Sequence, residues 1–174
     1  AALLMSNFQA NLRVLFHHTS TLTELVRELN TKVMANAKGE KFITLFIAKY
    51  NIVTRTLTYV NAAHNPPLIA SGNSISTLKI GCTGIGMFDE IDKIKEGIVN
   101  ISPGTTIVCY TDGLTELEND NGEDFGIDSL RDLIKANPKL NMMELNVKIM
   151  ETVMNYKQSR PYIDDIALFS IKIF

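Results

Sequence analysis

The chain has 174 residues, of which 45% are hydrophobic and 21% are charged, as expected for one globular domain with one hydrophobic core. Its 17 basic and 19 acidic side chains leave a net charge of -2. The basic residues do not cluster among aromatic ones, so nucleic acid is not an expected partner. No apolar run reaches the ~18 residues of a membrane span, and no leader pattern opens the sequence. We therefore expect a cytoplasmic segment without membrane contact.

The first forty residues carry two helical patterns. Apolar residues recur at helical spacing from Leu3 to Phe16 without Gly or Pro, which predicts a helix with one buried face. Thr21 and Glu24 then match a capping box, in which each side chain satisfies the other's backbone amide, and open a second helix. Position 1 is not Met, and the first pattern is already running there, so we expect a fragment that begins inside an element.

Runs of β-branched and aromatic residues separated by turn formers predict the strands. These strands cover residues 42–48, 56–61, 67–70, 75–78, 97–101 and 105–110. Ser71-Gly72-Asn73 predicts a hairpin turn, because Gly and Asn tolerate the positive φ of tight hairpins. The 105–110 run is almost wholly apolar, which predicts a central strand. The two cysteines, Cys82 and Cys109, lack the spacing of a zinc or disulfide site and are expected to be small core residues.

Two further helices and a last strand are predicted in the C-terminal third. Asp128 is expected to cap a short helix that ends before Pro138, because proline cannot continue the hydrogen-bond ladder. Asn141 and Glu144 match a second capping box, which opens an amphipathic helix. A final strand is predicted over residues 166–174. Helices combined with a mostly antiparallel sheet pattern predict an α+β layered domain.

Two acidic motifs adjoin predicted buried strands. Tyr110-Thr111-Asp112-Gly113 puts an aspartate where an apolar strand ends, and Ile163-Asp164-Asp165-Ile166 puts two where the final strand starts. Alone, each also fits a simple turn or a solvated strand entrance. Antiparallel pairing would bring the motifs together, and carboxylates clustered without Lys or Arg repel unless a cation lies among them. Oxygen-only ligands favour magnesium or manganese over zinc, and a binuclear site of this kind activates water and neutralises a phosphoryl group.

Further motifs lie between and around these two. In chain order the set is Phe42-Ile43-Thr44-Leu45-Phe46, Tyr59-Val60-Asn61-Ala62-Ala63-His64-Asn65-Pro66-Pro67, Gly84-Ile85-Gly86, Tyr110-Thr111-Asp112-Gly113-Leu114-Thr115-Glu116, Phe125-Gly126 and Asp164-Asp165-Ile166. This ordered set resembles the successive motifs of the SpoIIE/RsbU branch of PPM-type phosphatases. The resemblance runs from end to end, and even Ala1-Ala2-Leu3-Leu4-Met5 resembles the helix start that follows the family's glycine-containing aspartate motif.

The resemblance implies a PPM-type αββα sandwich, with two mainly antiparallel sheets flanked by helices. It implies removal of phosphate from phosphoserine or phosphothreonine by a water bridged between two Mn²⁺ or Mg²⁺ ions, without a phosphoenzyme. On this mapping Asp112 and Asp164 match metal-binding aspartates. Asp165 is either a further ligand or a solvated flanking carboxylate. No catalytic residue is assigned beyond the metal ligands.

Four other residues are candidates for the cleft or for contact with the metal ligands. Gly113 belongs to the Asp112 turn. His64 is a candidate general acid, because imidazole titrates near neutral pH, or a structural hydrogen-bonding residue at a turn. Asn61 either orients that turn or lines the cleft, and Glu116 either supports the metal ligands or faces solvent.

The family's earlier acidic motif and its metal-bridging aspartate would lie upstream of Ala1. We therefore expect residues 1–174 to be a single phosphatase-domain fragment without its first strands and upstream acidic motifs, incomplete at the N-terminus. Because the bridging aspartate is missing, we expect the fragment alone to bind metal weakly or not at all and to have little activity. An exposed sheet edge could pair with another chain, so a homodimer is one expectation. An upstream sensor or regulatory domain is another.

The leading hypothesis is a signalling phosphatase that acts on a phosphorylated STAS-type anti-sigma-factor antagonist. The alternative is a non-catalytic partner-binding domain with the same fold and structural aspartates. A nucleotide-binding module is disfavoured, because Gly84 and Gly86 lack the strand-to-helix context of a phosphate loop and no Lys-Ser/Thr follows them.

Overall fold

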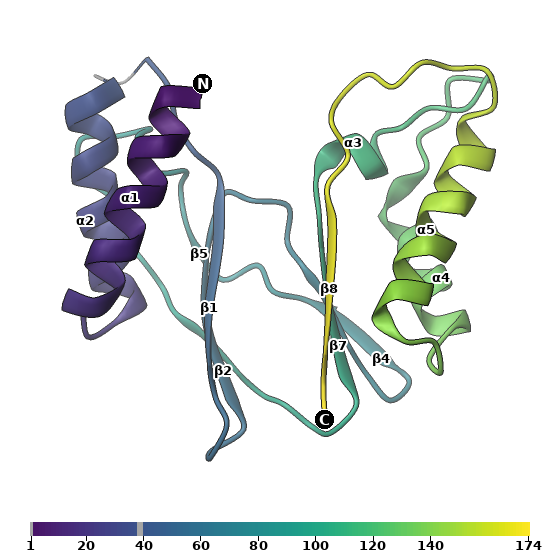
Figure 1. Ribbon diagram of the computed structural model, residues 1–174, viewed down its shortest axis with the longest axis horizontal. Coiled ribbons are helices and arrows are strands. Elements are labelled where there is room, and N and C mark those ends of the chain that lie inside the picture. Colours follow the sequence, from purple (N-terminus) through teal and green to yellow (C-terminus); the bar gives the residue numbers. More distant parts are fainter. Residues whose placement is uncertain (1, 38–39) are drawn as a thin grey trace. The chain divides into compact units, whose positions relative to one another are not determined.

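The computed structural model describes residues 2–37 and 40–174 of the chain. These residues form two compact units. Unit 1 comprises Ala1–His64 and Leu78–Asn100, and unit 2 comprises Asn65–Thr77 and Ile101–Phe174. Each unit contains one four-stranded sheet with helices packed against it (Figure 1). The predicted class, α+β with two mainly antiparallel sheets flanked by helices, is therefore confirmed.

Unit 1 is built on the hairpin of two long strands. Its elements are α1 (Ala2–His18), α2 (Leu22–Ala37), β1 (Leu45–Asn51), β2 (Thr56–Ala62), β5 (Gly81–Cys82) and β6 (Gly97–Asn100). β2 pairs antiparallel with β1 and β6 and parallel with the short β5. α2 packs on β2, and α1 lies alongside α2 (Figure 1).

Unit 2 is a fully antiparallel sheet in the order β4-β3-β7-β8. Its elements are β3 (Leu68–Ser71), β4 (Ser74–Thr77), β7 (Thr105–Tyr110), α3 (Asp112–Thr115), α4 (Gly126–Ala136), α5 (Met142–Lys157) and β8 (Leu168–Ile173). β7 is an interior strand, as its apolar sequence predicted. The β3–β4 hairpin turns at Gly72, whose φ of +57° is the left-handed conformation that the turn requires.

The buried apolar side chains form two clusters rather than the single expected core. In unit 1, Leu25, Val26 and Leu29 of α2 pack with Val60 of β2. In unit 2, residues of β3, β7, α4 and α5 form the second cluster, which includes the fully buried Ile149 of α5. Each sheet buries one face under its own helices, so each unit gathers its own apolar surface.

Both predicted capping boxes are present, one complete and one altered. At the start of α5, the Glu144 amide donates to the Asn141 side chain and the Asn141 amide donates to the Glu144 carboxylate, at 3.0 and 2.9 Å. At α2, the Glu24 amide donates to the Thr21 hydroxyl (3.1 Å), but the Glu24 carboxylate accepts from Ser20 instead of Thr21 (2.9 Å). The motif nevertheless marks the helix start correctly.

Several predicted boundaries were wrong, among them the start of the final strand, which is Leu168 rather than residue 166. Asp128 does not cap α4, because the chain turns into the helix at Gly126, with a φ of +75°, and Asp128 lies in the first turn, paired with Arg131. The first strand begins at Leu45 rather than at position 42, because Ile43 forms only an isolated bridge with Ile85.

The two cysteines are free and half-buried rather than fully buried, and Cys82 packs against the core of unit 1. Burial raises the pKa of both thiols, that of Cys109 to about 11. No helix in the described part of the chain has the length and apolar character that crossing a membrane requires.

Candidate metal centre

The two acidic motifs lie side by side in unit 2. β7 and β8 are antiparallel neighbours, and their ladder ends where Tyr110 pairs with Leu168. Asp112, two residues after β7, is the first residue of α3, and Asp165 lies three residues before the start of β8, next to Asp164. The predicted convergence of the two motifs by antiparallel pairing is confirmed for the backbone.

Thr111 continues the ladder beyond the last strand pair by using its side chain. Its amide donates to the carbonyl of Ala167 at 3.1 Å, but the Ala167 amide donates to the Thr111 hydroxyl at 2.9 Å. The same hydroxyl donates to the carbonyl of Asp165 at 2.9 Å. The Thr111 hydroxyl thus fixes the Asp164-Asp165 segment against the end of β7. Thr111 is part of the Tyr110-Thr111-Asp112-Gly113 motif, but the sequence pattern does not predict this role.

Gly113 explains how closely the two segments approach. It is buried, and a Cβ atom at this position would lie 2.7 Å from the Asp165 carbonyl oxygen and 3.2 Å from the Asp164 carbonyl carbon. Real Cβ atoms do not approach backbone that closely, so a glycine is required by contact rather than by an unusual φ. Gly113 therefore acts through packing at the place where the two motifs meet.

The three aspartates are exposed and carry little internal bonding. The Gly113 amide donates to Oδ1 of Asp112 at 3.1 Å, and the Asp165 amide donates to Oδ1 of Asp164 at 2.7 Å. Among the described residues of unit 2, no lysine or arginine forms an ion pair with any of them. Their charge is therefore compensated by no cationic side chain within the unit.

The carboxylate oxygens are the right type of ligand for a hard divalent cation, but too few of them are grouped together. Carboxylate oxygens are the ligands that Mg²⁺ and Mn²⁺ prefer. Among the described residues, however, no group of three or more histidine, cysteine, aspartate or glutamate side chains is arranged to hold a metal ion. The structure brings the backbones of Asp112, Asp164 and Asp165 together, and their role as metal ligands stays a prediction.

A pocket of about 340 Å³ adjoins these motifs. It is lined by Gly113, Glu116, Leu117, Glu118, Asp124, Ile163 and Asp164. Glu116, a candidate from the sequence, is exposed and lines the same pocket as Gly113 and Asp164. The pocket is strongly acidic at its rim.

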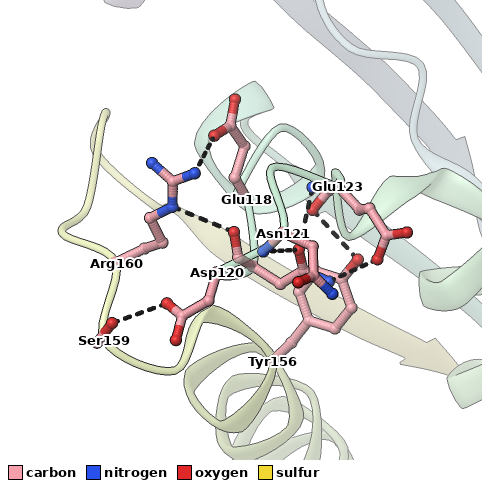
Figure 2. Close-up of polar contacts among 8 residues, drawn as sticks. Glu118, Asp120, Asn121, Glu123, Tyr156, Ser159 and Arg160 are labelled. Atoms are coloured by element: carbon pink, nitrogen blue, oxygen red, sulfur yellow. Dashed lines mark hydrogen bonds and ion pairs between the residues drawn. The ribbon is translucent and has the colours of Figure 1, made fainter.

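The loop that forms one wall of this pocket is fixed by the end of α5 and the residues after it (Figure 2). Arg160 donates through Nε to the Asn119 carbonyl at 3.2 Å and pairs with Glu118 at 3.6 Å. Ser159 donates to Asp120 at 2.8 Å, and the Tyr156 hydroxyl contacts the carbonyl of Glu123 at 3.2 Å. Sequence analysis missed these contacts, because they join segments about forty residues apart.

Asn61 and His64 belong to unit 1, and both have partners there. Asn61 is only 5% exposed, its amide nitrogen donates to the Leu78 carbonyl at 3.2 Å, and its carbonyl oxygen accepts from the His64 amide at 2.8 Å. The His64 Nδ1 lies 3.3 Å from the Thr44 hydroxyl. Asn61 therefore orients the turn after β2, one of its two predicted roles.

The fold of the chain is that of PP2C-type phosphatases. The SiaA-PP2C domain of Pseudomonas aeruginosa superimposes with a TM-score of 0.86 at 18% sequence identity, covering 99% of this chain and 70% of that chain. At this identity the likeness establishes the fold alone.

The sequence defines the family. The model of the family described as Stage II sporulation protein E (SpoIIE) matches residues 1–174. Protein IcfG of Synechocystis sp. is 27% identical over 203 residues, covering 98% of this chain and 31% of that protein. Phosphoserine phosphatase RsbU of Bacillus subtilis is 30% identical over 102 residues, covering 58% of this chain and 30% of that protein. The chain belongs to the SpoIIE family, as its ordered motifs predicted, and spans about three-tenths of the length of these two relatives.

Proposed function

We propose that this chain is the core of a metal-dependent phosphoserine/phosphothreonine protein phosphatase that acts in bacterial signalling in the cytoplasm. The observation that carries the proposal is the junction of the two acidic motifs in unit 2. There, the Thr111 hydroxyl and the close packing of Gly113 hold the Asp112 and Asp164-Asp165 segments together. Membership in the SpoIIE family supports the same reading.

In the proposed centre, Asp112 and Asp164 would hold Mn²⁺ or Mg²⁺, with Asp165 as a third carboxylate or a solvated neighbour. Bound there, a pair of such ions supplies an activated water and neutralises charge on the phosphoryl group. The protein's own contribution is to hold exposed carboxylates without a competing cationic side chain. Rigid backbone bonding at Thr111 keeps their positions fixed relative to each other.

Further ligands for the ions would come from sequence outside these 174 residues. Two observations support this part of the proposal. No three-ligand group is found in residues 2–37 and 40–174, and the chain covers only 70% of the SiaA-PP2C chain. The 174-residue segment alone is then a single phosphatase-domain fragment with weak metal binding and little activity. Isothermal titration with Mn²⁺ tests this, since micromolar or tighter binding to the segment would contradict it.

For the substrate we propose a phosphorylated STAS-type protein, an anti-sigma-factor antagonist. The similarity to RsbU, whose name is phosphoserine phosphatase, supports a phosphoserine substrate. An upstream sensor or regulatory domain is proposed as well, because the relatives are about three times as long as the matched segment.

The test is Mn²⁺-dependent phosphate release from a phosphoserine STAS protein by the full-length protein that contains this segment. Asp112→Asn should abolish release. Asp132→Asn, in an exposed carboxylate of α4, is the matched control and should leave release unchanged. Equal rates for the Asp112→Asn variant and the unmodified protein would refute the proposed centre.

A non-catalytic partner-binding domain is the second candidate, favoured by the absence of a three-ligand group among the described residues. The same experiment separates the two. A folded, Mn²⁺-loaded protein that binds the phosphorylated STAS protein without releasing phosphate would support the binding domain.

A further inference from the structure

A second pocket lies in unit 2, with a volume of about 300 Å³. Its apolar walls include Ile75 of β4, Ile134 of α4 and Leu145 of α5, together with Leu140 from the connection between the two helices. Ile134 and Leu145 are 4% and 2% exposed, so the floor of the pocket is part of the core surface. Pockets that bind small organic molecules are concave and mostly apolar, and start at about this volume.

This pocket is separate from the acidic motifs. It adjoins the beginning of β7, where Gly104 and Thr106 line it, whereas Asp112 follows the end of that strand. At about 3.3 Å per residue, Thr106 and Asp112 are roughly 20 Å apart along the strand. Figure 1 shows α3 and the α4–α5 connection at opposite ends of unit 2.

Two lysines line the pocket, and no carboxylate does. Lys172 is half-buried, and its ammonium group donates to the Pro138 carbonyl at 3.2 Å, which leaves two of its three donors available. Lys135 is exposed on the last turn of α4. Over the described residues neither lysine forms an ion pair, although the whole chain carries a net charge of -2. Positive charge is therefore concentrated beside the apolar part of the pocket wall.

We propose that this pocket binds a small amphiphilic anion, a monocarboxylate with an unbranched apolar tail of roughly eight carbon atoms. The volume and the apolar floor suit the tail, since each buried methylene contributes about the same favourable transfer free energy. Lys172 and Lys135 bind the carboxylate through charge-assisted hydrogen bonds. The site does not depend on the phosphatase activity and persists whether or not the acidic motifs bind metal.

The first experiment titrates the 174-residue chain with octanoate and follows methyl NMR signals. Saturable shifts confined to methyl groups that line the pocket, such as those of Ile75, Leu140 and Leu145, are expected. Octanoate should bind at least about tenfold more tightly than 1-octanol or acetate, because each comparator lacks one of the two recognised parts. No saturable binding of octanoate, equal binding of 1-octanol, or shifts confined to residues outside the pocket lining would overturn the proposal.

Two lysine variants then test the charge. Lys172→Gln should weaken octanoate binding about five- to tenfold and leave 1-octanol binding unchanged. Lys139→Gln is the matched control, because Lys139 is exposed on the same α4–α5 connection but does not line the pocket. Equal loss in both variants would mean a general charge effect and would refute the site. Leu140→Trp should fill the cavity and weaken both ligands, whereas unchanged binding in this variant would also refute it.

Discussion

The turn after β2 in unit 1 and the turn after β7 in unit 2 both carry a polar motif, but they use it differently. In unit 1, Asn61 is buried, and both ends of its amide are bonded to backbone. In unit 2, Asp112 and Asp164 are exposed, and it is Thr111 that bonds the backbone around them. The Asn61 amide bonds the backbone of its own unit, whereas the carboxylates of Asp112 and Asp164 keep oxygen atoms that can bind a ligand.

The difference separates a buried, hydrogen-bonded polar side chain from exposed carboxylates for which we propose metal binding. A buried polar group that is fully bonded rigidifies its surroundings and has no capacity left for a ligand. An exposed carboxylate positioned by a neighbour's bonds contributes little to stability and can bind a cation. Stability measurements should therefore separate the two turns.

The largest effect is expected for Gly81→Ala in unit 1. A Cβ atom at Gly81 would overlap the backbone carbonyl of Asn61, which the ladder between β2 and β5 holds in place. We expect a loss of about 3 kcal/mol in the free energy of unfolding, measured by urea denaturation. Gly72→Ala is the control, because its Cβ would meet open space and only its positive φ is strained, at a cost of about 1 kcal/mol. Equal losses would contradict the close approach at Gly81.

Asn61→Ala should cost about 2 kcal/mol, because it leaves the Leu78 carbonyl and the His64 amide without their partner. The measurement is again the urea midpoint. Asn121→Ala is the matched control, since that asparagine is exposed and makes no side-chain hydrogen bond in the described chain. If Asn61→Ala lowered the free energy of unfolding no more than the control does, the hydrogen bonds of the Asn61 side chain would not stabilise the turn after β2.

Thr111→Val should cost about 1 kcal/mol, because it removes the hydroxyl but keeps the shape of the side chain. The Ala167 amide loses its acceptor and should exchange its hydrogen faster, which hydrogen-exchange NMR measures directly. Thr111→Ser retains the hydroxyl and should retain the protection. Unchanged exchange at Ala167 in the valine variant would show that the segment before β8 is held by other contacts.

Asp112→Asn should change the free energy of unfolding by no more than about 0.5 kcal/mol, because the Asp112 side chain is exposed and its carboxylate accepts only one hydrogen bond in the described chain. In the full-length protein the same substitution should abolish Mn²⁺-dependent phosphate release. Thermal melting of the variant beside the phosphate assay separates the two effects. A large loss of stability would place Asp112 with Asn61 among the structural residues.

A pH prediction concerns the strand that leads to Asp112. Burial raises the pKa of the Cys109 thiol to about 11, and the reactive form is the thiolate. In a Cys82→Ala background, alkylation by iodoacetamide should keep accelerating up to about pH 11, above the range in which a free cysteine levels off. Because the folded state favours the neutral thiol, the stability that it contributes is fully present below pH ~9 and is lost as the pH rises toward 11. If the alkylation rate instead stopped rising near pH 9, the Cys109 thiol would be exposed to solvent.

Much of the fold was predictable from local patterns. Capping residues at Thr21 and Asn141 marked helix starts, the turn at Gly72 marked a hairpin, and the apolar run of β7 marked an interior strand. The boundaries that were wrong depended on distant contacts. Ile43 pairs with Ile85, and Gly126 rather than Asp128 turns the chain into α4. The propensities of neighbouring residues do not predict contacts with residues far away in the sequence.

The family and the pair of acidic motifs could be recognised without coordinates, because they depend on the identity and order of residues such as Asp112 and Asp164. The contacts that hold those motifs together depend on how the chain folds. The bond from Thr111 to Asp165 spans 54 residues, and the contact that requires a glycine at 113 is made by the same distant segment. The register of β7 against β8 creates both contacts, and that register follows from which faces of the two strands can be buried together.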